Sequence, residues 1–327
     1  MQSQASSSRG RRALAVLAGL TALSAPLAAE AHRSWLAPAN TNFSGDDPWV
    51  AVDAAVSNEL FYADHRPMNL DSVTAIAPDG QKLPIENGVK GRYRSTFDVH
   101  LTQPGTTRIF VLNSNVGGTY VVDGQTYRVG APRGGMGGGE GGSGPGPQSN
   151  ARPAGQRQGP GPAPAQGPGP GGPPGGGPRA LQGVADPAQI PANATDIKLV
   201  QSTSRNETFV TRGAPTALKP TGVGLELAET SVHPTDLVAD EAATFRLLMD
   251  GKPAAGVEVT IVAADQRFAA DVPADIKVKT DAQGAFTVKW PTAGFYWLNA
   301  TAEGGAGSIP HSVRRASYTA TLEVQKP

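Results

Sequence analysis

The chain has 327 residues, enough for two domains of ordinary size, and its formal net charge at pH 7 is +0. Apart from the N-terminal segment and the pair Arg314-Arg315 it has no basic cluster, which argues against nucleic acid as a partner because phosphate binding needs a basic surface. The absence of cysteine excludes disulfides, thiolate metal sites, iron–sulfur clusters and cysteine nucleophiles. Any metal site must therefore use histidine, carboxylate, backbone or water ligands.

The first 31 residues are typical of a secretory signal peptide. Three arginines precede the apolar run Ala13–Leu23, and small residues lead to an A-x-A cleavage site at Ala29-Glu30-Ala31. The apolar run is too short to span a bilayer. We therefore expect a periplasmic protein that does not span the membrane after cleavage, with His32 as its first residue.

The segment 32–213 is predicted to form an N-terminal β-sandwich domain. Apolar and polar residues alternate over short segments that are separated by turn signals, and no amphipathic helix interrupts them. Asp123-Gly124 is a strong signal for the tip of a hairpin. The predicted strands are Trp49–Val56, Val73–Ala77, Arg92–Leu101 and Thr107–Asn113, followed by the hairpin Tyr120–Val129.

Residues 131–183 are rich in glycine and proline and contain almost no large apolar side chain. Such a segment cannot bury enough surface to offset the entropy of ordering, so we predict a disordered insertion. The next apolar segments, Ile197–Gln201 and Glu207–Val210, are too few for a separate domain. We expect both to return to the first pair of sheets.

A second β-sandwich is predicted over 222–327, after a proline-containing boundary. About seven strands in roughly 100 residues is the scale of an immunoglobulin-like sandwich. The aromatic group formed by Trp290 and Phe295–Trp297 is interpreted as core rather than as a sugar-stacking platform. The predicted strands are Leu225–Leu227, Ala243–Met249, Val257–Ala263, Ile276–Thr280, Ala285–Trp290, Gly294–Ala300 and Ala316–Val324. The predicted fold class is all-β, with two antiparallel immunoglobulin-like sandwich domains.

Several phrases together resemble one exported bacterial family of unknown function, which is often labelled as the periplasmic component of nickel/cobalt uptake. They are Ala31–Leu36, Leu60–Pro67, Tyr93–Leu101, Lys219–Leu227 and Gly294–Leu298. The phrases Asp250–Val257 and Thr280–Phe286 also resemble transthyretin-like or collagen-adhesin B-type repeats, which usually serve as stalks or scaffolds. The resemblance implies periplasmic metal handling, with a membrane transporter component as partner.

Histidines supply the candidate metal ligands. If cleavage leaves His32 at the N-terminus, its α-amine, with a reference pKa of about 7.7–8.0, and its imidazole, at about 6.5, both lose a proton readily to a metal. We predict that His65 and His100 complete the donor set and that Asp64 or Asp98 orients an imidazole. A nitrogen-rich site suits Ni(II), Co(II) or Cu(II) better than magnesium or calcium.

Structural explanations compete with this metal site. His65 fits a hydrogen-bonded loop, and His100 fits the charged outer face of a strand. His233 and His311 adjoin prolines and are interpreted as structural or exposed. Because no catalytic motif occurs, we predict a non-enzymatic transition-metal-binding protein. The alternatives are a non-catalytic adhesion or carbohydrate-binding module and, more weakly, a copper enzyme with an N-terminal histidine brace.

Overall fold

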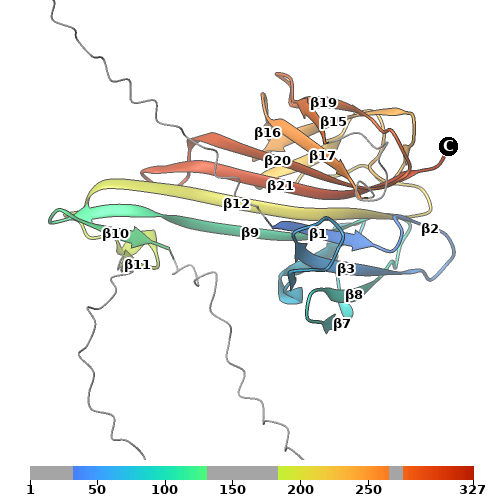
Figure 1. The fold of residues 1–327 in the computed structure, drawn as a ribbon, viewed down its shortest axis with the longest axis horizontal. Coiled ribbons are helices and arrows are strands. Elements are labelled where there is room, and N and C mark those ends of the chain that lie inside the picture. Colours follow the sequence, from blue (N-terminus) through green and yellow to red (C-terminus); the bar gives the residue numbers. More distant parts are fainter. Residues whose placement is uncertain (1–31, 131–182, 265–274) are drawn as a thin grey trace, which may run out of the picture.

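The computed structural model describes residues 32–130, 183–264 and 275–327, which fold almost entirely as β-strands (Figure 1). Their only helical elements are the short 3-10 turns Leu70–Ser72 and Pro187–Gln189. The predicted all-β class and sandwich architecture are therefore confirmed. The predicted signal peptide and, apart from Gly183, the predicted disordered insertion lie outside the described residues.

The first sheet has five antiparallel strands. Along the sheet these are β1 (Arg33–Pro38), β3 (Trp49–Ser57), β8 (Ser95–His100) and β7 (Glu86–Lys90), with β4 (Arg66–Pro67) also paired to β3. In β3 the side chains of Val50, Val52 and Ala54 are buried while Trp49 and Ala51 are exposed, as the alternation predicts.

The central sheet has twelve strands. Along its main path they are β11 (Gly183–Val184), β10 (Gln125–Val129), β9 (Gly105–Val122), β12 (Thr195–Arg212), β21 (Ser312–Gln325), β20 (Gly294–Ala306), β17 (Glu258–Ala263) and β18 (Ile276–Lys279). The short strands beside this path are β2 (Asn42–Phe43), β5 (Val73–Ile76), β6 (Lys82–Leu83) and β14 (Leu237–Val238).

A third sheet of four strands completes the layers. It consists of β13 (Leu225–Glu229), β15 (Ala242–Met249), β16 (Lys252–Pro253) and β19 (Ala285–Lys289). Figure 1 shows the long ribbons of β9, β12 and β21 in the middle, with the five-stranded sheet on one side and the four-stranded sheet on the other.

The strand β12 borders both hydrophobic cores. Val210 belongs to the core under the five-stranded sheet, whereas its neighbour Phe209 belongs to the core under the four-stranded sheet. Successive side chains of a strand point to opposite faces, so one strand forms a wall of both sandwiches. One core lies under each of the two smaller sheets, and the two sandwiches share the central sheet.

The central sheet is mixed rather than purely antiparallel. β12 pairs with β21 in parallel from Leu199↔Ser312 to Thr208↔Thr321. Parallel neighbours need a long crossover connection. Here the intervening second sandwich is that connection, and this explains how the two sandwiches come to share a sheet.

A group of charged side chains is buried where the two sandwiches meet. Glu207 of β12 is fully buried and accepts hydrogen bonds from Arg108 at 2.7 Å and from the Tyr318 hydroxyl at 2.6 Å. A guanidinium nitrogen of Arg205 lies 3.6 Å from the same carboxylate. Burial, reinforced by the negative charge of Glu207, raises the pKa of Tyr318 well above its ordinary value. The tyrosine therefore stays protonated and donates to the carboxylate.

Candidate functional site

Two predicted metal ligands, His32 and His65, lie face to face. Their ring centroids are 3.8 Å apart and the ring planes differ by 5°. His32 precedes β1 and His65 precedes β4, and both strands pair with Ala55 and Val56 of β3 from opposite sides. The register of two strands on one partner therefore brings together residues that are 33 positions apart in the sequence.

The N-terminal strand that carries His32 is anchored to both sandwiches. Trp35 is 2% exposed, donates from its indole nitrogen to Ser57 at 2.8 Å, and packs against Phe61. From the second sandwich, the indole of Trp297 donates to the carbonyl of Ser34 at 3.1 Å. His32 is exposed and directly precedes this anchored strand, so the position of its backbone is set by the fold.

The loop that carries His65 is held by Asp64. The Asp64 carboxylate accepts a hydrogen bond from the backbone N–H of Asn58 at 2.8 Å, and this bond is the main reason that the pKa of Asp64 lies below its usual range. Within the same loop, Phe61 has a φ of +60°, a rare conformation for an aromatic residue. Asp64 therefore positions His65 by fixing the loop backbone.

The structure separates the other two predicted ligands from the histidine pair. His100 lies at the opposite end of β3, where it pairs with Trp49. At about 3.3 Å per residue, the length of this strand puts roughly 25–30 Å between its ends. The His100 ring stacks on Trp49 at 4.4 Å and faces the Asp47 carboxylate at 2.5 Å, while Asp98 accepts a hydrogen bond from Asn87. The candidate site is thereby reduced to His32 and His65, with Asp64 in support.

Of the two remaining histidines, His311 is exposed and His233 has structural surroundings. The His233 side chain is 8% exposed, its Nδ1 lies 2.8 Å from the Thr235 hydroxyl, and its Nε2 lies 3.2 Å from that of Thr106. Burial lowers the pKa of His233, although Glu229 acts in the opposite direction. His233 thus fills a neutral, hydrogen-bonded position between the sandwiches.

The side chains of His32 and His65 offer two imidazole groups as possible metal ligands. Within 32–130, 183–264 and 275–327 no group of three or more histidine or carboxylate side chains converges as a metal site. A third nitrogen would come from the α-amine that cleavage before His32 creates. With one ring rotated out of the stack, these nitrogens can ligate a borderline transition metal.

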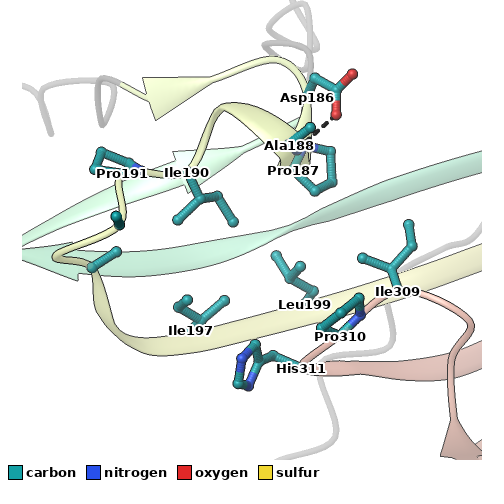
Figure 2. A pocket seen from close by; sticks show the side chains of 12 residues that line it. Asp186, Pro187, Ala188, Ile190, Pro191, Ile197, Leu199, Ile309, Pro310 and His311 are labelled. Carbon is teal, nitrogen blue, oxygen red and sulfur yellow. Dashed lines mark hydrogen bonds between the residues drawn. The ribbon is translucent and has the colours of Figure 1, made fainter.

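A separate cavity of about 550 Å³ lies beside the outer ends of β9 and β12 (Figure 2). Aliphatic and proline side chains such as Ile190, Leu199 and Ile309 form most of its lining. His311 lies at its edge, and the Asp186 carboxylate accepts a hydrogen bond from the backbone of its own turn, Ala188, at 2.8 Å. This lining offers apolar contact and no converging polar groups.

A second, polar cavity of about 400 Å³ lies next to the histidine pair, between the five-stranded sheet and the central sheet. Ser34 of β1 and Arg66 of β4, close to His32 and His65 in sequence, form part of its wall. No motif in the sequence predicts this wall. The available signal was a run of polar residues, 201–206, at positions of β12 that border a core.

No helix in the described part of the chain is long and apolar enough to cross a membrane. No curated protein matches the chain. Among solved structures, the crystal structure of the ICAM-5 D1-D4 ectodomain fragment is 8% identical over 90% of this chain and 51% of that chain, with a TM-score of 0.17. This chain thus spans about half the length of that protein, and the TM-score is too low to indicate a shared fold.

The family comparison covers most of the sequence. The family described as "Domain of unknown function (DUF4198)" matches residues 29–304, which run from the predicted cleavage site into the second sandwich. The match includes the histidine pair and the strands that hold it. The chain therefore belongs to this family of unknown function.

Proposed function

We propose that this is an exported, periplasmic protein that binds a divalent transition-metal ion as cargo through His32 and His65. Nickel, cobalt and copper are the candidate ions. The partner would be a membrane transporter component of a nickel/cobalt uptake system, as the sequence resemblance implies. The observation that supports the proposal best is the 3.8 Å contact between two imidazoles held by strands on opposite sides of β3.

The donor chemistry favours these metals. Imidazole nitrogens suit nickel, copper and cobalt, whereas magnesium and calcium prefer oxygen ligands. An α-amine on His32 adds a third nitrogen, with a reference pKa of about 7.7–8.0 that allows deprotonation by a metal near neutral pH. The resulting set of three nitrogens belongs to two residues.

Ion binding requires a change in the stacked pair. The lone pair of an imidazole nitrogen lies in the plane of its ring, so two parallel rings do not direct their lone pairs at one point. His32 is exposed and His65 is half-buried. Rotation of His32 about its side-chain torsions, with its backbone held by β1, would turn its nitrogen and the neighbouring amine toward His65.

The proposal is tested by metal titration of the mature chain beginning at His32. Its affinities for Ni(II), Co(II) and Cu(II) are compared with those of a chain that carries one additional glycine before His32. We expect the additional residue to weaken binding by more than about 100-fold, because even loss of a residue that only orients a ligand costs about 10–100-fold. Mass spectrometry of the exported protein checks that His32 is its first residue.

Substitutions separate the two ends of β3. His65→Gln should weaken binding as strongly as the added glycine, whereas His100→Gln should leave the affinity unchanged because its ring stacks on Trp49 at the far end. Equal affinities for the two N-terminal forms would remove the terminus from the site. An affinity that depends on His100 instead of His65 would overturn the assignment of the ligands.

A further inference from the structure

The polar cavity beside the histidine pair interrupts a hydrophobic sandwich. Toward the five-stranded sheet, β9 and β12 first present a core that includes Ile109, Val111 and Val210. Further along the same face, the next cross-strand row is Asn113–Ser204–Ser317, according to the register of β9, β12 and β21. The interior of the sandwich therefore changes from apolar to polar at this end.

Asn206 is the least satisfied residue of this wall. Its side chain lines the cavity, the residue is 7% exposed, and neither the Oδ1 nor the Nδ2 atom has a hydrogen-bond partner. A buried polar group without a partner destabilises a protein by about 1–3 kcal/mol, and native structures satisfy nearly all such groups. An amide that faces a cavity can obtain both partners from a bound molecule.

The charge of the cavity restricts what that molecule is. Arg66 contributes to the wall, and none of the described residues that line the cavity is an aspartate or a glutamate. The lining also includes Arg205, whose guanidinium lies beside Glu207 on the opposite face of β12. The remaining polar groups are neutral hydroxyls and amides, among them Ser317 and Thr319. A volume of about 400 Å³ falls within the range of roughly 300–1,000 Å³ that is usual for small-molecule sites.

From these contacts we infer that the cavity is a binding site for a small hydroxycarboxylate. Its carboxylate would pair with the planar guanidinium of Arg66, which matches carboxylate geometry. Its hydroxyl would donate to the Oδ1 atom and accept from the Nδ2 atom of Asn206, as one hydroxyl can do both. The inference is independent of the proposed metal site, because none of these contacts involves His32 or His65.

The test uses the full mature chain, freed of metal on a solid chelating resin and kept in a buffer without carboxylates. Citrate is titrated into this protein by calorimetry, and glycerol serves as the uncharged hydroxyl control. We expect saturable binding of citrate, a citrate-dependent rise in melting temperature, and neither effect with glycerol. Because no metal is present, this result is separate from the success or failure of the metal proposal.

Two variants locate the ligand. Asn206→Leu keeps the approximate size of the side chain and removes both amide atoms, and Arg66→Gln removes a charge at an exposed residue where misfolding is not expected. Arg66→Gln should weaken citrate binding by about tenfold or more, since a hydrogen bond to a charged group is worth at least that factor. Asn206→Leu should weaken it by about tenfold, because it removes two hydrogen bonds to the neutral hydroxyl of the ligand. Arg94→Gln is the matched control, because Arg94 is an exposed arginine paired with Asp53 outside the cavity.

The inference is overturned by any of three results. These are an absence of citrate binding in the wild-type protein, equal citrate affinity in Arg66→Gln and wild type, or equal binding of glycerol and citrate. An absence of citrate binding would mean that the cavity holds only water. Either of the other two results would mean that the charge of Arg66 does not contribute to ligand recognition. Should Asn206→Leu fail to fold, Arg66→Gln alone decides the outcome.

Discussion

The two faces of β12 bury polar side chains in opposite ways. Toward the second sandwich, Glu207 is fully buried and accepts hydrogen bonds from Arg108 and Tyr318. Toward the first sandwich, the adjacent residue Asn206 is nearly as buried, yet neither atom of its amide has a partner. One strand thus carries a paired charge and an unpaired amide at successive positions.

This difference distinguishes buried polar groups that stabilise the fold from buried polar groups that are available to a ligand. The buried carboxylate of Glu207 is compensated by partners from β9 and β21, although the Nε atoms of Arg108 and Arg205 in the same cluster have no hydrogen-bond partner among the described residues. Among the described residues no group pairs with the amide of Asn206, and the proposed ligand of the cavity would supply its partners. Substitutions on the two faces should therefore have different consequences for stability.

The largest effect is expected for Glu207→Ala. Removing the carboxylate leaves the buried guanidinium groups of Arg108 and Arg205 without their anion, and loss of one partner of a buried pair costs about 3–5 kcal/mol. Urea unfolding of the metal-free protein measures the loss. Asp53→Ala is the control, because its pair with Arg94 is partly exposed and should contribute no more than about 1 kcal/mol. Equal losses for the two variants would show that the Glu207 cluster is not a buried charge network.

A smaller loss is expected for Tyr318→Phe. This variant keeps the packing of the ring and removes only the hydroxyl that donates to Glu207 at 2.6 Å. A hydrogen bond to a charged group contributes about 1.5–3 kcal/mol, so the free energy of unfolding should fall by that amount. Combining the variant with Glu207→Ala should add little further loss, because both substitutions remove the same interaction. Full additivity would argue against coupling of the two side chains.

The same face also contains a group that should make stability depend on pH. His233 lies near Thr106, Glu229 and Asp236, and burial lowers its pKa below the value of about 6.5 expected in the unfolded chain. The unfolded state therefore binds the proton first as pH falls, and stability decreases from about pH 6.5 down through the lowered folded-state pKa. The slope is at most about 1.4 kcal/mol per pH unit for this one group.

His233→Gln isolates this contribution. Glutamine retains hydrogen-bonding capacity but does not titrate, so the difference in stability between wild type and variant should shrink as pH falls from 7.5 to 5. Urea unfolding at several pH values measures that difference, and the other histidines cancel in the comparison. A difference that is constant with pH would contradict the lowered pKa of His233.

Local signals were enough to predict much of the fold. The strand at Val73–Ala77 was predicted almost to its ends, and the hairpin tip Asp123-Gly124 is confirmed, with φ values of +50° and +75°. The sequence predicts two short strands, Ile197–Gln201 and Glu207–Val210, where the structure has the single strand β12, because the residues between them, 202–206, are polar. These polar residues are held by pairing with β9 and β21, and the partners of such pairing cannot be read from one segment.

The candidate site was predictable to a similar extent. The pattern correctly put His100 and Asp98 on the outer face of their strand, away from buried Phe97 and Val99. It could not show which end of β3 each histidine would reach, because that depends on the register of three strands. The proximity of His32 and His65 was predicted as part of a donor set that also included His100, which lies elsewhere, and the place of Asn206 in a cavity wall was not predicted.

The smallest effect on stability is expected for Asn206→Leu. This variant tests directly whether the polar side chains on the two faces of β12 differ in their contribution to stability. In the absence of a ligand, the substitution removes a buried amide that has no protein partner and leaves no other group unpaired. Replacing such a group by an apolar side chain of similar size should change the free energy of unfolding by less than about 1 kcal/mol, or increase it. Urea unfolding in buffer without carboxylates measures this, beside Glu207→Ala as the adjacent position. A loss above about 2 kcal/mol would mean that the Asn206 amide stabilises the folded state. The polar side chains on both faces of β12 would then have a structural role.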